Sequence, residues 1–225
     1  LIAEWEQAKA LVDSGALGRL RHAAVSWQVH TYAYRTGVTS WKTDPEQGGV
    51  LNLFGAHVFA YLEWLLGPIQ RVSASRGAAG REGSLAKLSL ECANGISASV
   101  SLNGAAPRGS QHRVECDGEE GRLVLENTGT DYVKGFRLWH AAGPGGAPQL
   151  VRVPQRTSVG ADGRILPVAR LVRRFLDWVC DGVAQRPNWE DGHRVQCVLD
   201  AARTAHAAGT WVTVSSRAAQ PAVAI

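Results

Sequence analysis

The chain has 225 residues, of which 45% are hydrophobic and eight are tryptophan. This length and composition allow a large α+β unit with a substantial core. The formal net charge of +4 is spread thinly, with no run of five or more Lys and Arg residues. Because nucleic-acid binding normally needs a concentrated basic patch, the charge argues against a nucleic-acid partner.

Four cysteines lie far apart and form no CxxC pair: Cys92, Cys116, Cys180 and Cys197. We expect them to be buried as small hydrophobic side chains. No secretory leader is visible, and these features together favour a reducing, cytoplasmic location. The apolar run Gly48–Ile69 has the length of a membrane span, but its polar residues, including Asn52 and His57, would be costly in hydrocarbon. The sequence therefore argues against a membrane partner.

The first part of the chain alternates helix and strand. A stripe of apolar residues predicts a helix over Ile2–Ser14, and strict alternation predicts a half-buried strand over His22–His30. The segment Tyr32–Gln47 is expected to be a loop, and Leu51–Leu66 a helix closed by Gly67-Pro68.

Hairpin-linked strands follow. Ile96–Leu102 alternates between apolar residues and serines, and it is preceded by Asn94-Gly95, the preferred pair of a two-residue hairpin turn. Asp117-Gly118 is a second hairpin signal. The other strands are expected at Ile69–Ser75, Leu85–Cys92, His112–Cys116, Arg122–Glu126, Phe136–His140, Gln149–Val153 and Trp211–Val214.

Two helices return near the end. Val168–Cys180 carries an apolar stripe, and Asn188–Ala208 begins with a capping asparagine followed by acidic residues. We expect one domain over residues 1–216 and a disordered, alanine-rich tail over 217–225. The fold class is predicted to be α+β: a large, mostly antiparallel open sheet with helices on one face. The other face is free for a homodimer or homotetramer.

Three blocks of the sequence resemble the C-terminal domain of the Gfo/Idh/MocA family, named after glucose–fructose oxidoreductase, inositol dehydrogenase and a rhizopine-catabolism protein. They are AKALVDSGALGRLRHAAVSW near the start, GGVLNLFGAHVFAYLEWLLGPI in the first long helix and WEDGHRVQCVLDAARTAHAAGTWVTV near the end. Their order and spacing cover almost the whole chain.

The resemblance implies a two-domain oxidoreductase that acts on a sugar or cyclitol. NAD or NADP would be bound by an N-terminal Rossmann domain that is absent from this chain. A lysine of that domain and a histidine of the first long helix would handle the alcohol proton. By this resemblance the histidine is His57, the catalytic candidate.

Two features depart from the family pattern. The nearest approach to a GxGxxG loop is Gly143-Pro144-Gly145-Gly146, and no helix is expected after it, so no cofactor site is predicted in this chain. Many relatives have an aspartate one turn before the histidine, where this chain has Leu53. Asn52 lies five residues before His57 and is expected to point away from it. Without a carboxylate, the imidazole is expected to be less basic and less firmly oriented.

The substrate-binding candidates are Trp41, Arg35, Lys42, Tyr34 and Asn52. Trp41 has the ordinary alternative of a packing residue, and Arg35 and Lys42 have that of solvated loop charges. His57 itself has the alternative of a core histidine bonded to a backbone carbonyl. The histidines show no metal-ligand spacing, so no metal is predicted.

The sequence thus favours the substrate-binding and oligomerisation domain of an NAD(P)-dependent oxidoreductase, inactive without its nucleotide-binding partner. The alternative is a non-catalytic module that oligomerises or binds a small ligand.

Overall fold

The computed structural model describes residues 2–38, 42, 44, 49–77, 83–107, 109–154 and 162–215. The helices are α1 (Ala3–Asp13), α2 (Tyr32–Thr36), the π-helix η1 (Leu51–Gly55), α3 (Ala56–Leu66), α4 (Ile165–Asp181) and α5 (Trp189–Ala208). The strands are β1 (Leu20–Gln28), β2 (Ile69–Arg76), β3 (Leu85–Cys92), β4 (Ser97–Asn103), β5 (Gln111–Gly118), β6 (Gly121–Asn127), β7 (Arg137–Ala142), β8 (Gln149–Val151) and β9 (Val212–Thr213).

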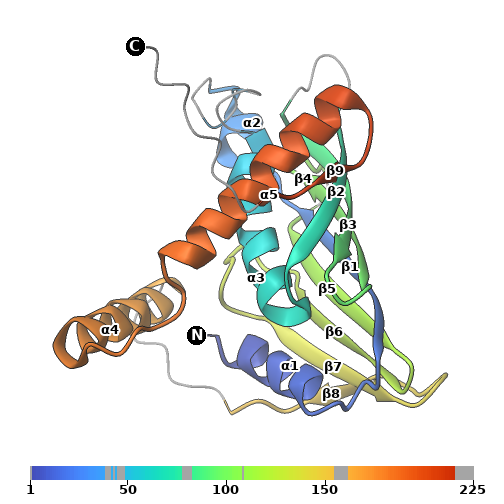
Figure 1. The fold of residues 1–225 in the computed structure, drawn as a ribbon, viewed down its shortest axis with the longest axis vertical. Helices are drawn as coiled ribbons and strands as arrows, with labels where there is room; N and C mark the ends of the chain where they lie inside the picture. The colour runs from blue at the N-terminus through green and yellow to red at the C-terminus, as the bar shows by residue number, and fades with distance from the viewer. Residues whose placement is uncertain are drawn as a thin grey trace.

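The strands that the structure describes form one nine-stranded sheet in the order β8-β7-β6-β5-β1-β4-β3-β2-β9. Neighbouring strands are antiparallel except β1 and β4, which run parallel. The first strand of the chain therefore lies in the middle of the sheet, between two antiparallel groups (Figure 1). The predicted α+β class with a large, mostly antiparallel open sheet is confirmed.

Alternating burial divides the sheet into an inner and an outer face. On β4, Ala98, Val100 and Leu102 are buried while Ser97 and Ser99 are exposed. The inner face packs against α1, α3 and α5, which lie on the same side of the sheet in Figure 1. Because a strand's side chains alternate between its two faces, the same pattern that predicted the strands also predicted which face is covered.

Helix α5 begins with a complete capping box. The side chain of Asn188 accepts hydrogen bonds from the backbone N–H groups of Glu190 and Asp191, and Asp191 bonds back to the N–H of Asn188. These bonds satisfy N–H groups that a helix start otherwise leaves unpaired. From this start, Val198, Leu199 and the alanines that follow pack into the core.

Helix α4 departs from the expected one-sided cover. None of its residues is buried, and it extends away from the sheet in Figure 1. Its apolar stripe, including Val168, Leu171, Phe175 and Val179, is exposed among the residues that the structure describes.

Several local expectations were wrong. A short helix, α2, stands at the start of the expected Tyr32–Gln47 loop, with Thr31 as its cap. The hairpin between β5 and β6 turns at residues 119 and 120, while Asp117 and Gly118 remain in β5. A Cβ on Gly118 would lie 2.0 Å from the carbonyl oxygen of Leu17, so close backbone approach, and not turn geometry, requires this glycine.

The cysteines behave in two ways. Cys92 and Cys116 are buried as expected, but Cys180 is exposed and Cys197 is half-buried. Cys180 is exposed because it lies on α4, which this chain does not cover. The expected disordered tail lies outside the described residues. None of the helices within the described ranges is long and apolar enough to cross a membrane.

Candidate functional site

His57 stands in the first turn of α3, and its side chain is exposed. Its ring lies over the inner face of the sheet near the carboxyl end of the central strand β1, with its centroid 6.2 Å from that of Trp27. No hydrogen-bond partner is found for the ring among the residues that the structure describes, so the alternative of a core histidine bonded to a carbonyl is not what is observed. Partial burial lowers the pKa of His57 below its usual value. The imidazole is therefore predominantly neutral at pH 7.

Beneath His57 lies a row of three side chains from adjacent strands. Trp27 of β1 pairs in register with His112 of β5, which pairs with Asn127 of β6. All three are buried on the inner face, at 7%, 8% and 3% exposure. The row therefore forms one wall, hereafter the Trp27–His112–Asn127 wall, at the carboxyl end of β1.

His112 is held in this wall by stacking and by one hydrogen bond. Its ring is parallel to that of Trp27, with centroids 4.1 Å apart and an interplanar angle of 4°. Its Nε2 lies 3.1 Å from the hydroxyl of Tyr61 on α3. Burial, with a smaller contribution from the charge of His57, lowers the pKa of His112 to about 3. His112 is thus a neutral, structural imidazole that fixes Trp27 under His57.

The helix that carries His57 begins with a π-turn. Leu51–Gly55 form η1, and α3 follows at Ala56 without a break. In a π-helix the hydrogen bonds run from i to i+5, so the angular offset between Asn52 and His57 is smaller than an α-helix would give. Periodicity at 3.6 residues had predicted one uniform helix here, and such single widened turns occur frequently at functional sites.

The side chain of Asn52 nevertheless contacts the neighbouring helix α5. Its side-chain oxygen accepts a hydrogen bond of 2.7 Å from Arg203 on α5. Leu53, at the position of the expected aspartate, is half-buried and packs against the core. The reduced basicity expected for His57 agrees with its lowered pKa, whose cause is burial.

The other candidates do not gather around His57. Tyr34 is half-buried in α2, where its ring packs against Gly104 beside Val50, two helical turns before His57. Burial raises the pKa of Tyr34, with a smaller opposing effect from Arg76. Arg35 is exposed and lies 5.7 Å from the ring of Tyr32.

Lys42 is exposed, and its backbone carbonyl accepts a hydrogen bond from Gly49. Gly49 adopts a positive φ of 68° against the backbone of Gly83, so it serves the helix entry. Trp41 lies outside the described residues.

One aromatic side chain beside the wall was missed by the sequence analysis. Tyr132, in the loop between β6 and β7, lies with its ring 6.3 Å from that of Trp27 and is 45% exposed. No local pattern points to it, because its neighbour Trp27 is more than 100 residues away in the chain and is reached only through the sheet register.

The glycine-rich segment 143–146 does not form a phosphate loop. Gly143 and Gly145 adopt positive φ values in the hairpin between β7 and β8, and a strand, not a helix, follows. Phosphate binding by a glycine loop needs the N-terminus of a helix directly after it. The described part of the chain also contains no cluster of three or more His, Cys, Asp or Glu residues placed to hold a metal ion.

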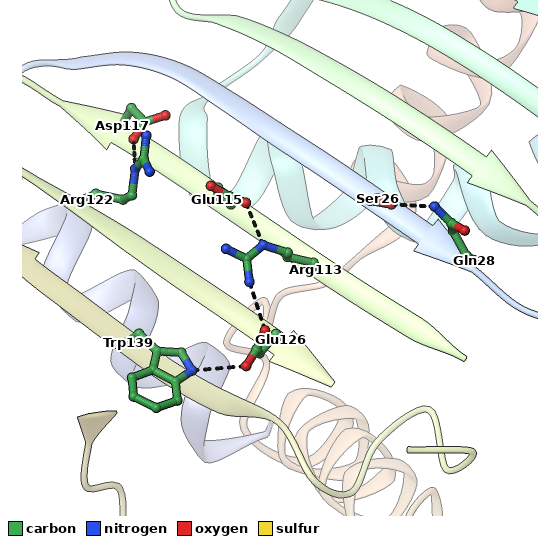
Figure 2. Close-up of polar contacts among 8 residues, drawn as sticks. All are labelled: Ser26, Gln28, Arg113, Glu115, Asp117, Arg122, Glu126 and Trp139. Carbon is green, nitrogen blue, oxygen red and sulfur yellow. Dashed lines mark hydrogen bonds and ion pairs between the residues drawn. The ribbon is translucent and has the colours of Figure 1, made fainter. Parts of the chain in front are cut away.

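The outer face of the sheet has a different chemistry. Arg113 donates to Glu115 and to Glu126, and Trp139 donates to Glu126 at 3.2 Å (Figure 2). Arg122 and Asp117 form another pair on the same face (Figure 2). Further along the face, a register row runs through the small side chains of Ser73, Ser89, Ser99 and Ala24.

Comparison with known proteins agrees with this architecture. The profile of the GFO/IDH/MocA C-terminal domain family matches residues 5–124, more than half of the chain. The chain belongs to this family. It is 32% identical over 234 residues to an uncharacterized oxidoreductase of Synechocystis sp., an alignment that covers 95% of this chain and 62% of that relative. The chain therefore spans less than two thirds of the relative's length.

Solved structures share the fold. A levoglucosan dehydrogenase in complex with NADH and levoglucosan matches with a TM-score of 0.78 and 20% identity, over 95% of this chain and 66% of that one. An oxidoreductase from Agrobacterium radiobacter, in complex with NAD+, L-tartaric acid and magnesium, matches with a TM-score of 0.77 and 18% identity, over 95% and 62% of the two chains. An oxidoreductase domain protein from Kribbella flavida has a TM-score of 0.78 and 18% identity, over 95% and 63%.

Proposed function

We propose that this chain is the substrate-binding and oligomerisation domain of an NAD(P)-dependent oxidoreductase that interconverts an alcohol and a carbonyl on a sugar or cyclitol. The observation that carries the proposal is the position of His57: an exposed, neutral imidazole on a rigid helix, seated on the Trp27–His112–Asn127 wall. Family membership and the NADH and levoglucosan named for a neighbour of the same fold support the substrate and cofactor classes.

His57 is the proton acceptor in this proposal. In alcohol oxidation the substrate O–H donates to the unprotonated ring nitrogen of His57 while the carbon–oxygen double bond forms. The dinucleotide, when bound by a neighbouring domain, supplies the hydride chemistry. Since the imidazole is exposed, its proton then exchanges directly with water. In the direction of carbonyl reduction, protonated His57 returns the proton to the oxygen.

Helix α4 supports the proposed nucleotide-binding neighbour. Its exposed apolar side chains include Leu171, Val172, Phe175 and Leu176, at 39–58% exposure. Contiguous apolar surface of this kind is typical of an interaction site. The Synechocystis relative extends well beyond the aligned region, which leaves room for a further domain. We propose that this domain is a Rossmann domain and that it covers the apolar side of α4.

The outer face supports the proposed second copy. Among the described residues no helix packs on this face, and the row Ser73–Ser89–Ser99–Ala24 presents small side chains that allow another sheet to approach closely. We propose a homodimer or homotetramer through this face. Replacing Ser99 with Arg would place a long cation at its centre. This change should lower the mass measured by light scattering in solution, whereas Gln196→Arg, at an exposed position of α5, should leave the mass unchanged.

The proposal is tested on the protein that joins this chain to its nucleotide-binding part. We expect reduction of NAD+ or NADP+ with one of a panel of sugars and cyclitols, and a loss of about 10²–10⁴-fold in kcat for His57→Ala. The isolated chain should give no saturable change in NADH fluorescence. Because the pKa of His57 is lowered, kcat/KM for oxidation should hold its plateau to below pH 6.5 and fall only at more acidic pH.

Control measurements separate this role from a structural one. His30→Ala removes an exposed imidazole on the loop after β1 and should leave kcat unchanged. A His57→Ala enzyme that is folded and retains full kcat would eliminate the proposed proton transfer. A protein without any dinucleotide-linked activity on the panel would favour the non-catalytic module.

A further inference from the structure

Tyr132 occupies an unusual position for a large aromatic residue. It lies in the loop of residues 128–135, its ring meets that of Trp27 at 6.3 Å in an edge-on arrangement, and it remains 45% exposed. Trp27 itself is almost fully buried under it, at 7% exposure. Tyr132 thus covers the indole without being taken into the core.

The loop that presents Tyr132 is built around a buried asparagine. The side-chain oxygen of Asn127 accepts from the N–H of Gly129 at 2.8 Å. Its side-chain nitrogen donates to the carbonyl groups of Asp131 at 2.7 Å and Lys134 at 3.0 Å. Asn127 therefore ties the beginning and the end of the loop together through one side chain. It belongs to the same wall as Trp27.

A carboxylate fixes the tip of the loop. Asp131, next to Tyr132, accepts from the N–H groups of Val133 at 2.8 Å, Lys134 at 3.0 Å and Gly163 at 3.1 Å. Burial alone would raise the pKa of Asp131, but these donors and the charge of Lys134 outweigh it and lower the pKa. Ordering a surface loop costs conformational entropy. The hydrogen bonds of Asn127 and Asp131 offset this cost and hold the exposed ring of Tyr132 in one place.

His57 and Tyr132 meet at a common neighbour. Their ring centroids lie 6.2 Å and 6.3 Å from that of Trp27, and they come from different elements, α3 and the loop after β6. Both rings are exposed, while the indole that each of them contacts is buried. A molecule bound at His57 would therefore meet an aromatic surface held at a fixed place beside it.

We propose that Tyr132 is a substrate-contacting residue, whose ring packs against the C–H-rich face of a six-membered polyol ring while His57 contacts a hydroxyl group. This inference rests on the proposed oxidoreductase function and adds the shape of its substrate subsite. Aromatic packing of this kind contributes about 0.5–1.5 kcal/mol, which corresponds to roughly two- to tenfold in affinity. Because the contact is present in both ground and transition state, it affects binding more than the chemical step.

The test uses the complete protein with NADH bound, and levoglucosan, L-sorbose and myo-inositol as probes. Dissociation constants are measured by calorimetry on this NADH complex, and KM and kcat are measured with NAD+ or NADP+ as the hydride acceptor for each alcohol probe that is turned over. For Tyr132→Ala we expect Kd and KM to rise about tenfold with kcat within about threefold of wild type. For Tyr132→Phe, which keeps the ring, we expect less than a threefold change.

Trp211→Ala is the matched control, because Trp211 is also an exposed aromatic residue but lies beside β9 at the far edge of the sheet. It should leave Kd, KM and kcat at wild-type values. If wild type binds a probe and Tyr132→Ala binds it equally well, the subsite proposal is overturned while the oxidoreductase function stands. If wild type neither binds nor turns over any of these probes, the six-membered polyol is overturned as the substrate class. Activity on other alcohols would then show that the broader function survives.

Discussion

Strands β5 and β6 carry polar side chains on both faces of the sheet, and these side chains are paired differently on the two faces. On the inner face, His112 and Asn127 are buried, uncharged and hydrogen-bonded to partners within the chain. On the outer face, their sequence neighbours Arg113 and Glu126 are partly exposed and form ion pairs (Figure 2). The buried face carries neutral groups because an unpaired charge is costly in the core. The exposed face tolerates charged groups, but their ion pairs stabilise the fold only weakly.

The difference shows which face can change its partners. The polar side chains of the inner wall make neutral hydrogen bonds within the chain, so the wall can hold His57 and Tyr132 in constant positions. The outer pairs are screened by salt and can be exchanged for contacts with another chain. Four variants test this comparison, from the largest expected effect to the smallest.

Asn127→Ala should cause the largest loss of stability. It leaves the N–H of Gly129 and the carbonyl groups of Asp131 and Lys134 without their partner at a site that is 3% exposed. We expect a loss of about 3 kcal/mol in the free energy of unfolding, measured by urea denaturation. A loss below about 0.5 kcal/mol would show that the loop does not depend on this side chain.

His112→Gln should change the pH dependence of stability. The pKa of His112 is about 3 in the folded protein and about 6.5 in the unfolded chain, so between these values the unfolded chain binds more protons. The stability contributed by His112 is therefore fully present above pH 6.5 and is lost as the pH falls toward 3. We expect wild type to lose roughly 1 kcal/mol more per pH unit in this window than His112→Gln.

Tyr61→Phe is the companion to this variant. It removes the hydroxyl that bonds His112 but keeps the titrating imidazole, so it should be less stable than wild type at pH 7 and still retain the acid-side slope. Equal slopes for wild type and His112→Gln would mean that burial of this imidazole does not control acid stability.

Glu126→Gln should have the smallest effect. Glu126 pairs with Arg113 and Arg137 at side-chain exposures of 14–53%, a range in which solvent screens the interaction. We expect a loss of at most about 1 kcal/mol at low salt, vanishing at about 1 M NaCl. A larger loss of stability that does not depend on salt would mean that the outer ion pairs stabilise the fold as strongly as the inner hydrogen bonds do. The contrast between the two faces would then be wrong.

Much of the fold was predictable because the sequence repeats at the periods of its elements. The alternation of Ile96–Leu102 predicted β4, and Asn188 with Asp191 predicted the start of α5. Elements without such a signal were missed: the five-residue α2 is too short for a helical stripe, and the π-turn at Leu51–Gly55 has no signature at a period of 3.6.

The site was predictable only where it depended on local sequence. His57 became the catalytic candidate through the resemblance of its helix, and this role stays a prediction. Its exposure could not be predicted, since that depends on what the neighbouring strands and helices cover. The position of Tyr132 could not be predicted from the sequence, because its contact with Trp27 depends on the register of β1, β5 and β6. The substrate-binding roles of Tyr34, Arg35, Lys42, Asn52 and Trp41 stay predictions.

The central place of β1 has a consequence for how the chain assembles. The β4–β3–β2 and β5–β6–β7–β8 ribbons are contiguous in sequence, yet they meet only through this first strand, whose pairing with β4 joins residues about 75 positions apart. Such distant pairing slows folding because a long loop must close first. Without β1, β4 and β5 would each present an open edge to other chains, so this central strand is the one whose pairing protects both ribbons from aggregation.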